Sequence, residues 1–141
     1  MITDVVVADV CDAARVGEDF QSNAFVWTEI SRCQIQRYVE LLSILSNRRV
    51  SKKLYKDFPL VFEDPDREVA VYKLSDELVT LVSKIKDKSI PEIAILWSEA
   101  AVGYSNAMAL SKHATEALIA FRKMTKIAIR RKKTLLLRET P

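Results

Sequence analysis

Residue types that could do catalysis are sparse and scattered in this chain of 141 residues. His113, the sole histidine, stands beside Lys112, a setting typical of a solvated or helix-edge residue rather than of a general base. Cys33 has no neighbouring base in the sequence to generate a thiolate, so we expect it to pack in an apolar stripe. No zinc-protease, paired-cysteine, nucleophile-elbow or glycine-rich phosphate-loop motif occurs. The sequence therefore predicts neither an enzyme nor a bound metal or cofactor.

Basic side chains offer a better candidate site. The candidates stand near or beyond the ends of apolar stripes on three expected helices, and they are Arg32, Arg37, Lys86, Lys88 and Lys112. If folding brings them together, they form a cationic strip that grips a nucleic-acid backbone without reading its sequence. Taken singly, each is an ordinary solvated residue. The run 130–133 is a second candidate, and its alternative role is pairing with the negative end of its own helix dipole.

Composition indicates a folded, helix-rich chain. Hydrophobic residues make up 49% and charged residues 29%, with only two glycines and four prolines to interrupt helices. The length suits one domain covering residues 1–141. Two cysteines are too few for a disulfide scaffold, and no apolar run approaches the ~20 residues of a membrane span. We expect a soluble protein of a reducing compartment, with no membrane partner.

Charge is distributed unevenly, although the formal net charge is only +3. Residues 1–20 carry a balance of −4, from five acidic residues and Arg15. Residues 122–141 carry a balance of +7, from eight basic residues and Glu139. Distribution matters more than the sum for binding a charged partner. We therefore expect a peripheral acidic helix within residues 1–20 and a basic helix end and tail at 122–141.

The sharpest local pattern lies at residues 62–88. Pro65 predicts a turn, and the alternation over residues 69–73 predicts a short half-buried strand. Ser75 is placed to cap the next helix, with Asp76 and Glu77 in its first turn. The apolar face of that helix is predicted to be Leu74, Leu78, Leu81, Val82 and Ile85.

The rest of the chain is expected to be helical. Apolar spacing predicts a first helix from Thr3 or Asp4 to about residue 16, closed by Gly17, and a long second helix from Ser22 or Asn23 to about residue 47. A basic connector with a short helix follows at 48–58, and a further helix starts near Ser89 and Pro91. Gly103 weakens it, Ser105 or Asn106 can cap the next segment, and a final helix starts at Leu110. Its predicted seam is Leu110, Ala114, Ala117, Phe121, Met124 and Ala128. The predicted fold is all-α, an up-down four-helix bundle with a very small β element near 69–73.

Three stretches, in order, resemble the coat proteins of rod-shaped plant RNA viruses, the tobacco mosaic virus or virgavirus type. They are SRCQIQRYV at 31–39, FEDPDREVAVYKLSDELVTLVSKIKD at 62–87 and HATEALIAF at 113–121. The resemblance implies flat bundle subunits that stack helically and hold single-stranded RNA between turns. Arg32 and Arg37 match family arginines near RNA, whereas Lys86 and Lys88 stand near but not on the family's other pair. Where the family has paired aspartates, this chain has Lys112 and His113, which would strengthen RNA attraction.

Two functional hypotheses follow. The first is a viral capsid protein that self-assembles into rods around single-stranded RNA, within a virion and in the host cytoplasm during assembly. Such a protein needs no catalytic centre, but it needs several cations per subunit to offset phosphates. The alternative is a small cytosolic helical adaptor or immunity-type protein that binds one protein partner through its acidic first helix or basic tail.

Overall fold

The structure is a computed structural model that describes residues 1–19, 25–100 and 107–141. Its elements in chain order are β1 (Ile2–Ala8), η1 (Val10–Asp12), α1 (Ala13–Asp19), β2 (Val26–Glu29), α2 (Ile35–Ser46), α3 (Lys52–Tyr55), β3 (Leu60–Asp64), β4 (Val69–Lys73), α4 (Asp76–Ser83), η2 (Asp87–Ser89), α5 (Ile90–Glu99), α6 (Ala107–Arg131) and β5 (Thr134–Thr140).

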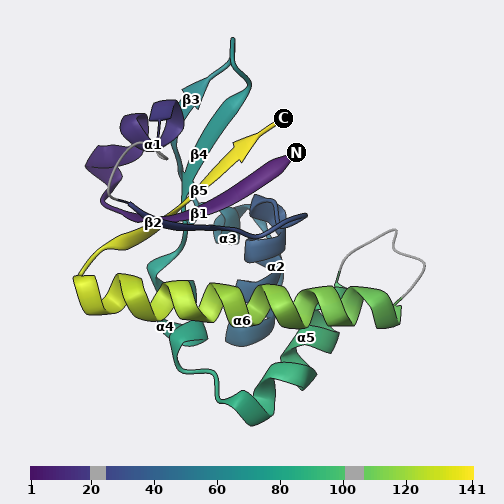
Figure 1. Cartoon of the computed structure of the whole chain (residues 1–141). Coiled ribbons are helices and arrows are strands. Elements are labelled where there is room, and N and C mark those ends of the chain that lie inside the picture. The colour runs from purple at the N-terminus through teal and green to yellow at the C-terminus, as the bar shows by residue number, and fades with distance from the viewer. Residues whose placement is uncertain (20–24, 101–106) are drawn as a thin grey trace.

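The strands form one antiparallel sheet in the order β2-β1-β5-β4-β3. The first and last strands are neighbours near its centre, paired from Ile2 opposite Thr140 to Ala8 opposite Thr134. Figure 1 accordingly shows the two termini side by side at one end of the sheet. Strands β2 and β3 are the sheet edges among the described residues.

Helices cover both faces of the sheet. On one face, α1 packs Ala13 and Val16 against Val6, Val71 and Leu136. On the other face, α2, α4 and α6 enclose the larger core (Figure 1). Its largest fully buried side chains include Trp97, Tyr38 and Phe121. Burial on both faces explains why central strands are continuous apolar runs rather than alternating ones.

The all-α prediction is wrong, because the chain is mixed α/β. Residues 2–8 were assigned to a helix from the spacing of apolar side chains, yet β-branched Val5, Val6 and Val7 favour a strand buried on both sides. Residues 26–29 form β2 rather than the start of a helix reaching residue 47, and α2 begins only at Ile35. The expected acidic helix at 1–20 is a strand followed by the short α1. The expected basic tail contains the end of α6 and the central strand β5.

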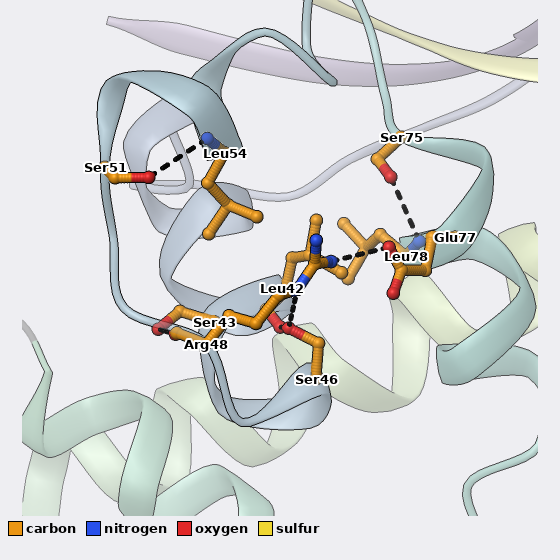
Figure 2. Close-up of polar contacts among 9 residues, drawn as sticks. All are labelled: Leu42, Ser43, Ser46, Arg48, Ser51, Leu54, Ser75, Glu77 and Leu78. Atoms are coloured by element: carbon orange, nitrogen blue, oxygen red, sulfur yellow. Dashed lines mark hydrogen bonds and ion pairs between the residues drawn. The ribbon is translucent and has the colours of Figure 1, made fainter.

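Local predictions with a specific chemical signal are confirmed. Strand β4 spans 69–73, and the hydroxyl of Ser75 caps α4 by accepting a hydrogen bond from the Leu78 amide at 3.3 Å. The connector contains the short helix α3. The hydroxyl of Ser51 caps this helix in the same way, by accepting a hydrogen bond from the Leu54 amide (Figure 2). The predicted signals at Ser22, Asn23, Gly103, Ser105 and Asn106 lie outside the described residues.

Gly17 does not close a helix, but lies inside α1 where the helix approaches β3. A Cβ atom at this position would stand 2.3 Å from two ring carbons of Phe62, Cδ1 and Cε1. Glycine is therefore required by the close contact between helix and strand. None of the described helices is both long enough and apolar enough to cross a membrane.

Candidate nucleic-acid interface

Helix α6 has one buried side and one exposed side. The inward seam predicted from the sequence is confirmed for the residues whose side chains are described, which are Ala114, Ala117, Phe121, Met124 and Ala128. Leu110 belongs to the first turns of α6, whose side chains are outside the described set. Because the seam fixes the rotation of the helix, it also fixes which residues point outward.

The outward side of α6 carries a row of cations. Exposed residues recur at steps of three and four along the helix, and they are Lys112, Glu116, Ile119, Lys123, Lys126 and Arg130. We call the four cations of this row the α6 basic stripe: Lys112, Lys123, Lys126 and Arg130. A rise of 1.5 Å per residue makes the stripe about 27 Å long. Within the described part of the chain, no ion pair engages any of these four side chains.

Arg32 and Arg37 line a common hollow of about 260 Å³ together with Met1, Gln34 and Gln36. We call it the Arg32–Arg37 hollow. Its lining contains two guanidinium groups and two side-chain amides, and no carboxylate. Arg32 is exposed, and its backbone adopts a left-handed conformation with φ of 57°. This conformation is uncommon for a residue with a Cβ atom and occurs here in the turn between β2 and α2.

Contacts behind the hollow hold Arg37 in place. Its Nη2 donates a hydrogen bond to the Trp97 carbonyl at 2.8 Å, and its Nη1 pairs with Glu40. Its guanidinium carbon lies 5.4 Å from the centre of the Trp97 ring. Burial raises the pKa of Glu40, and the charge of Arg37 opposes that rise. Two of the five guanidinium N–H groups are used in these bonds, and the Arg37 side chain is 14% exposed.

The turn that carries Arg32 contacts α6 beside Lys112. Nε2 of His113 is 2.9 Å from the carbonyl oxygen of Ser31, and Arg32 and Lys112 are the sequence neighbours of these two residues. His113 is therefore a structural contact between α6 and the turn before α2. It also lines a second hollow, of about 210 Å³, with Glu29 and Glu116.

Lys86 and Lys88 lie on a different loop from the other predicted site residues. Both are exposed and flank Asp87, whose carboxylate pairs with Arg122 Nη2 at 2.7 Å. Arg122 also donates a hydrogen bond to the carbonyl of Ile85 at 2.9 Å, so this loop is attached to the middle of α6. The structure thus places Arg32 and Arg37 on one hollow. It holds the turn that carries Arg32 against α6 one residue from Lys112, and it leaves Lys86 and Lys88 beside the midpoint of α6.

Other basic residues have structural partners. Arg48 of the connector pairs with Glu77 of α4 at 2.5 Å (Figure 2). Lys133, from the predicted run 130–133, pairs with Asp9 at 2.5 Å, and the hydrogen bond to this carboxylate raises the pKa of Lys133. Arg130 belongs to the α6 basic stripe, while Arg131 and Lys132 are exposed beyond it. The predicted run is therefore divided between a structural pair and the exposed surface.

Buried ionisable groups serve the fold. The Cys33 thiol is buried as expected, and its loss of hydration raises its pKa to about 12. Its neighbour Tyr38 also has a raised pKa, first because of burial and then because of Cys33. In the described residues, Asp9, Cys11 and Asp12 are the one group whose ligand atoms converge as a metal would require. Asp9 and Asp12 already pair with Lys133 and Arg15, so we assign no metal to this group.

Sequence reasoning missed Lys123 and Lys126. Both are in the basic segment 122–141, but that segment was interpreted as a helix end and tail rather than as part of a regular exposed row. The helix period could have identified them, because residues on the side of the helix opposite the predicted seam must face outward.

Comparisons with protein-family models, curated proteins and solved structures find no match to this chain.

Proposed function

We propose that this protein is a non-catalytic binding protein for single-stranded RNA, which it holds through the phosphate backbone. The α6 basic stripe supports this proposal, because it presents four cations along about 27 Å of one helix, and none of them has an ion pair with another residue that the structure describes. Cations in this state can neutralise phosphates and release counterions without first breaking a contact within the protein. We expect Arg32 and Arg37 to add to this cationic surface, because the Ser31–His113 contact holds the turn that carries Arg32 against α6.

The proposed contacts carry no sequence information. Lysine and arginine bind phosphates on any strand, and within the described part of α6 the outward row contains no aromatic side chain on which bases would stack. We therefore expect two unrelated RNA sequences of equal length to bind with affinities within about threefold of each other.

Fluorescence anisotropy with two labelled single-stranded RNAs tests this function. Saturable binding that weakens steeply with added salt is the expected result. Polyglutamate is the competitor, because it is a polyanion that has carboxylates in place of phosphates. If polyglutamate displaces the RNA when both supply the same concentration of negative charges, an acidic protein would be favoured as the partner. No RNA binding at low salt would contradict the proposal.

The coat-protein hypothesis adds helical self-assembly around the RNA, and this remains a prediction. The four-helix bundle on which it relied is absent, so its support is reduced to the charge pattern and the local motifs. Negative-stain microscopy of the purified protein tests it, with and without RNA. Rods that form with RNA would support a capsid role, whereas single particles under every salt and pH condition would contradict assembly and leave RNA binding in place.

A protein partner is the second candidate function, and helix α5 supplies the observation that favours it. Its outward side carries Ile95 and Leu96, which are 47% and 45% exposed, between exposed Glu92 and Glu99. Adjacent exposed apolar side chains with an acidic border suit a protein interface. A stoichiometric complex without nucleic acid, lost on I95E/L96E substitution and observed by size-exclusion chromatography, would favour this function.

A further inference from the structure

The Arg32–Arg37 hollow differs from the α6 basic stripe in shape. The stripe is an open row on a helix, where a strand can enter and leave at either end. The hollow is a concavity bounded by the turn that carries Arg32 and by the first turn of α2. The hollow can therefore receive a group that enters it, whereas the stripe contacts a strand that lies along it.

The chemistry of the hollow suits a phosphate group. Its lining includes two arginines and no acidic residue, and Glu40, which is not part of the lining, pairs with Arg37. A phosphate monoester carries about 1.5 to 2 negative charges near neutral pH, whereas an internal phosphodiester carries one. Arginine also offers paired N–H groups that match two phosphate oxygens at once. A monoester offers three free oxygens to such N–H groups and an internal linkage offers two, so the hollow complements a monoester better than an internal linkage.

Arg37 is positioned before any ligand arrives. Its bonds to the Trp97 carbonyl and Glu40, together with its contact with the indole ring, limit the rotamers of its long side chain. Binding therefore does not have to order this side chain, which lowers the entropy cost of binding. Arg32 is exposed at the surface of the hollow.

We infer that the Arg32–Arg37 hollow binds a phosphate monoester, supplied by the terminal phosphate of the RNA strand that lies along the α6 basic stripe. The Ser31–His113 contact supports this continuity, because it holds the turn that carries Arg32 against α6, one residue from Lys112. This inference rests on the proposed RNA-binding function. The same monoester chemistry occurs in a free nucleoside monophosphate, which is the other source to be tested.

Binding of three internally labelled RNAs of one sequence tests the inference. One has a 5′-phosphate, one a 3′-phosphate, and one hydroxyl groups at both ends. We expect one phosphorylated RNA to bind about tenfold more tightly than the hydroxyl RNA, which corresponds to about 1.4 kcal/mol. R32Q should abolish this preference. The matched variant R49Q changes an exposed arginine of the connector and should retain it.

Adenosine 5′-monophosphate and adenosine separate the inference from the proposed function. Chemical shifts of the arginine Nε–H groups, assigned with R32Q, should move on adding the monophosphate and stay unchanged with adenosine. If this occurs while no RNA binds, the hollow takes a free monoester and the RNA function fails. If the three RNAs bind equally and the monophosphate leaves the arginine signals unmoved, the inference fails while RNA binding stands. A phosphate preference that persists in R32Q also overturns it.

Discussion

Arg37 and Trp97 are joined by two hydrogen bonds that run in opposite directions. Arg37 Nη2 donates to the Trp97 carbonyl, and Trp97 Nε1 donates to the Arg37 carbonyl, both at 2.8 Å. The two residues belong to α2 and α5 and are 60 positions apart in the sequence. This pair therefore links the helix that begins at the hollow to the helix that packs against α6.

Replacing Trp97 by phenylalanine should destabilise the fold. W97F removes the Nε1 donor, leaves the Arg37 carbonyl without this bond, and leaves a space where the larger ring was almost fully buried. We expect the free energy of unfolding to fall by about 1–3 kcal/mol, measured by urea denaturation. W27F is the control, because Trp27 is 39% exposed on an edge strand and its change should cost less. Equal losses in both variants would contradict the structural role of the pair.

Alanine at position 17 should also destabilise the protein, although alanine favours helices by about 1 kcal/mol over glycine. Its Cβ would overlap the Phe62 ring, so α1 and β3 would have to separate. We expect a net loss of about 1–3 kcal/mol from this overpacking. In the double variant G17A/F62L the smaller side chain should recover part of the loss. A more stable G17A protein would show that α1 and β3 are not this close.

The pH dependence of stability should reflect Glu139. Its carboxylate accepts a hydrogen bond from the Ile35 amide at 3.0 Å, but burial is the larger effect and raises its pKa above 4.5. The folded state therefore binds this proton at a higher pH than the unfolded state does. The resulting stabilisation is fully present below pH 4.5 and is lost as pH rises through the raised pKa.

Comparison with E139Q isolates this effect, because glutamine keeps an oxygen acceptor for Ile35 and does not titrate. Urea denaturation from pH 7 down to 4.5 should show the wild-type protein gaining stability relative to E139Q. A relative loss of wild-type stability over the same interval would mean that the folded state prefers the charged carboxylate, contrary to the structure.

Local signals in the sequence predicted local structure well. The alternation at 69–73, the Ser75 cap and the apolar face of α4 each depend on residues within a few positions of one another. By contrast, β1 and β5 acquire their structure from each other across the whole chain, with Val5 opposite Leu137. Such runs have no period of two because both of their faces are buried, so periodicity could not separate strand from helix.

The candidate site was predicted only in part, because only some of its residues are close to one another in the sequence. Arg32 and Arg37 are close in sequence, and they share one hollow. Their approach to Lys112 depends on the contact between Ser31 and His113, which no local pattern indicates. Lys123 and Lys126 could have been found from the helix period alone, by following the side of α6 opposite its apolar seam.

The salt dependence of RNA binding tests the central claim most directly. The variant K112Q/K123Q/K126Q/R130Q removes the α6 basic stripe, and R49Q/K52Q/K53Q/K56Q removes the same charge from four exposed connector residues. With about 0.7 unit of slope per single-strand phosphate contact, the stripe variant should lower the slope of log affinity against log salt by up to about 3 units. The connector variant should keep nearly the wild-type slope. Equal reductions in both would show a response to net charge alone, and an unchanged slope in the stripe variant would contradict RNA binding along α6.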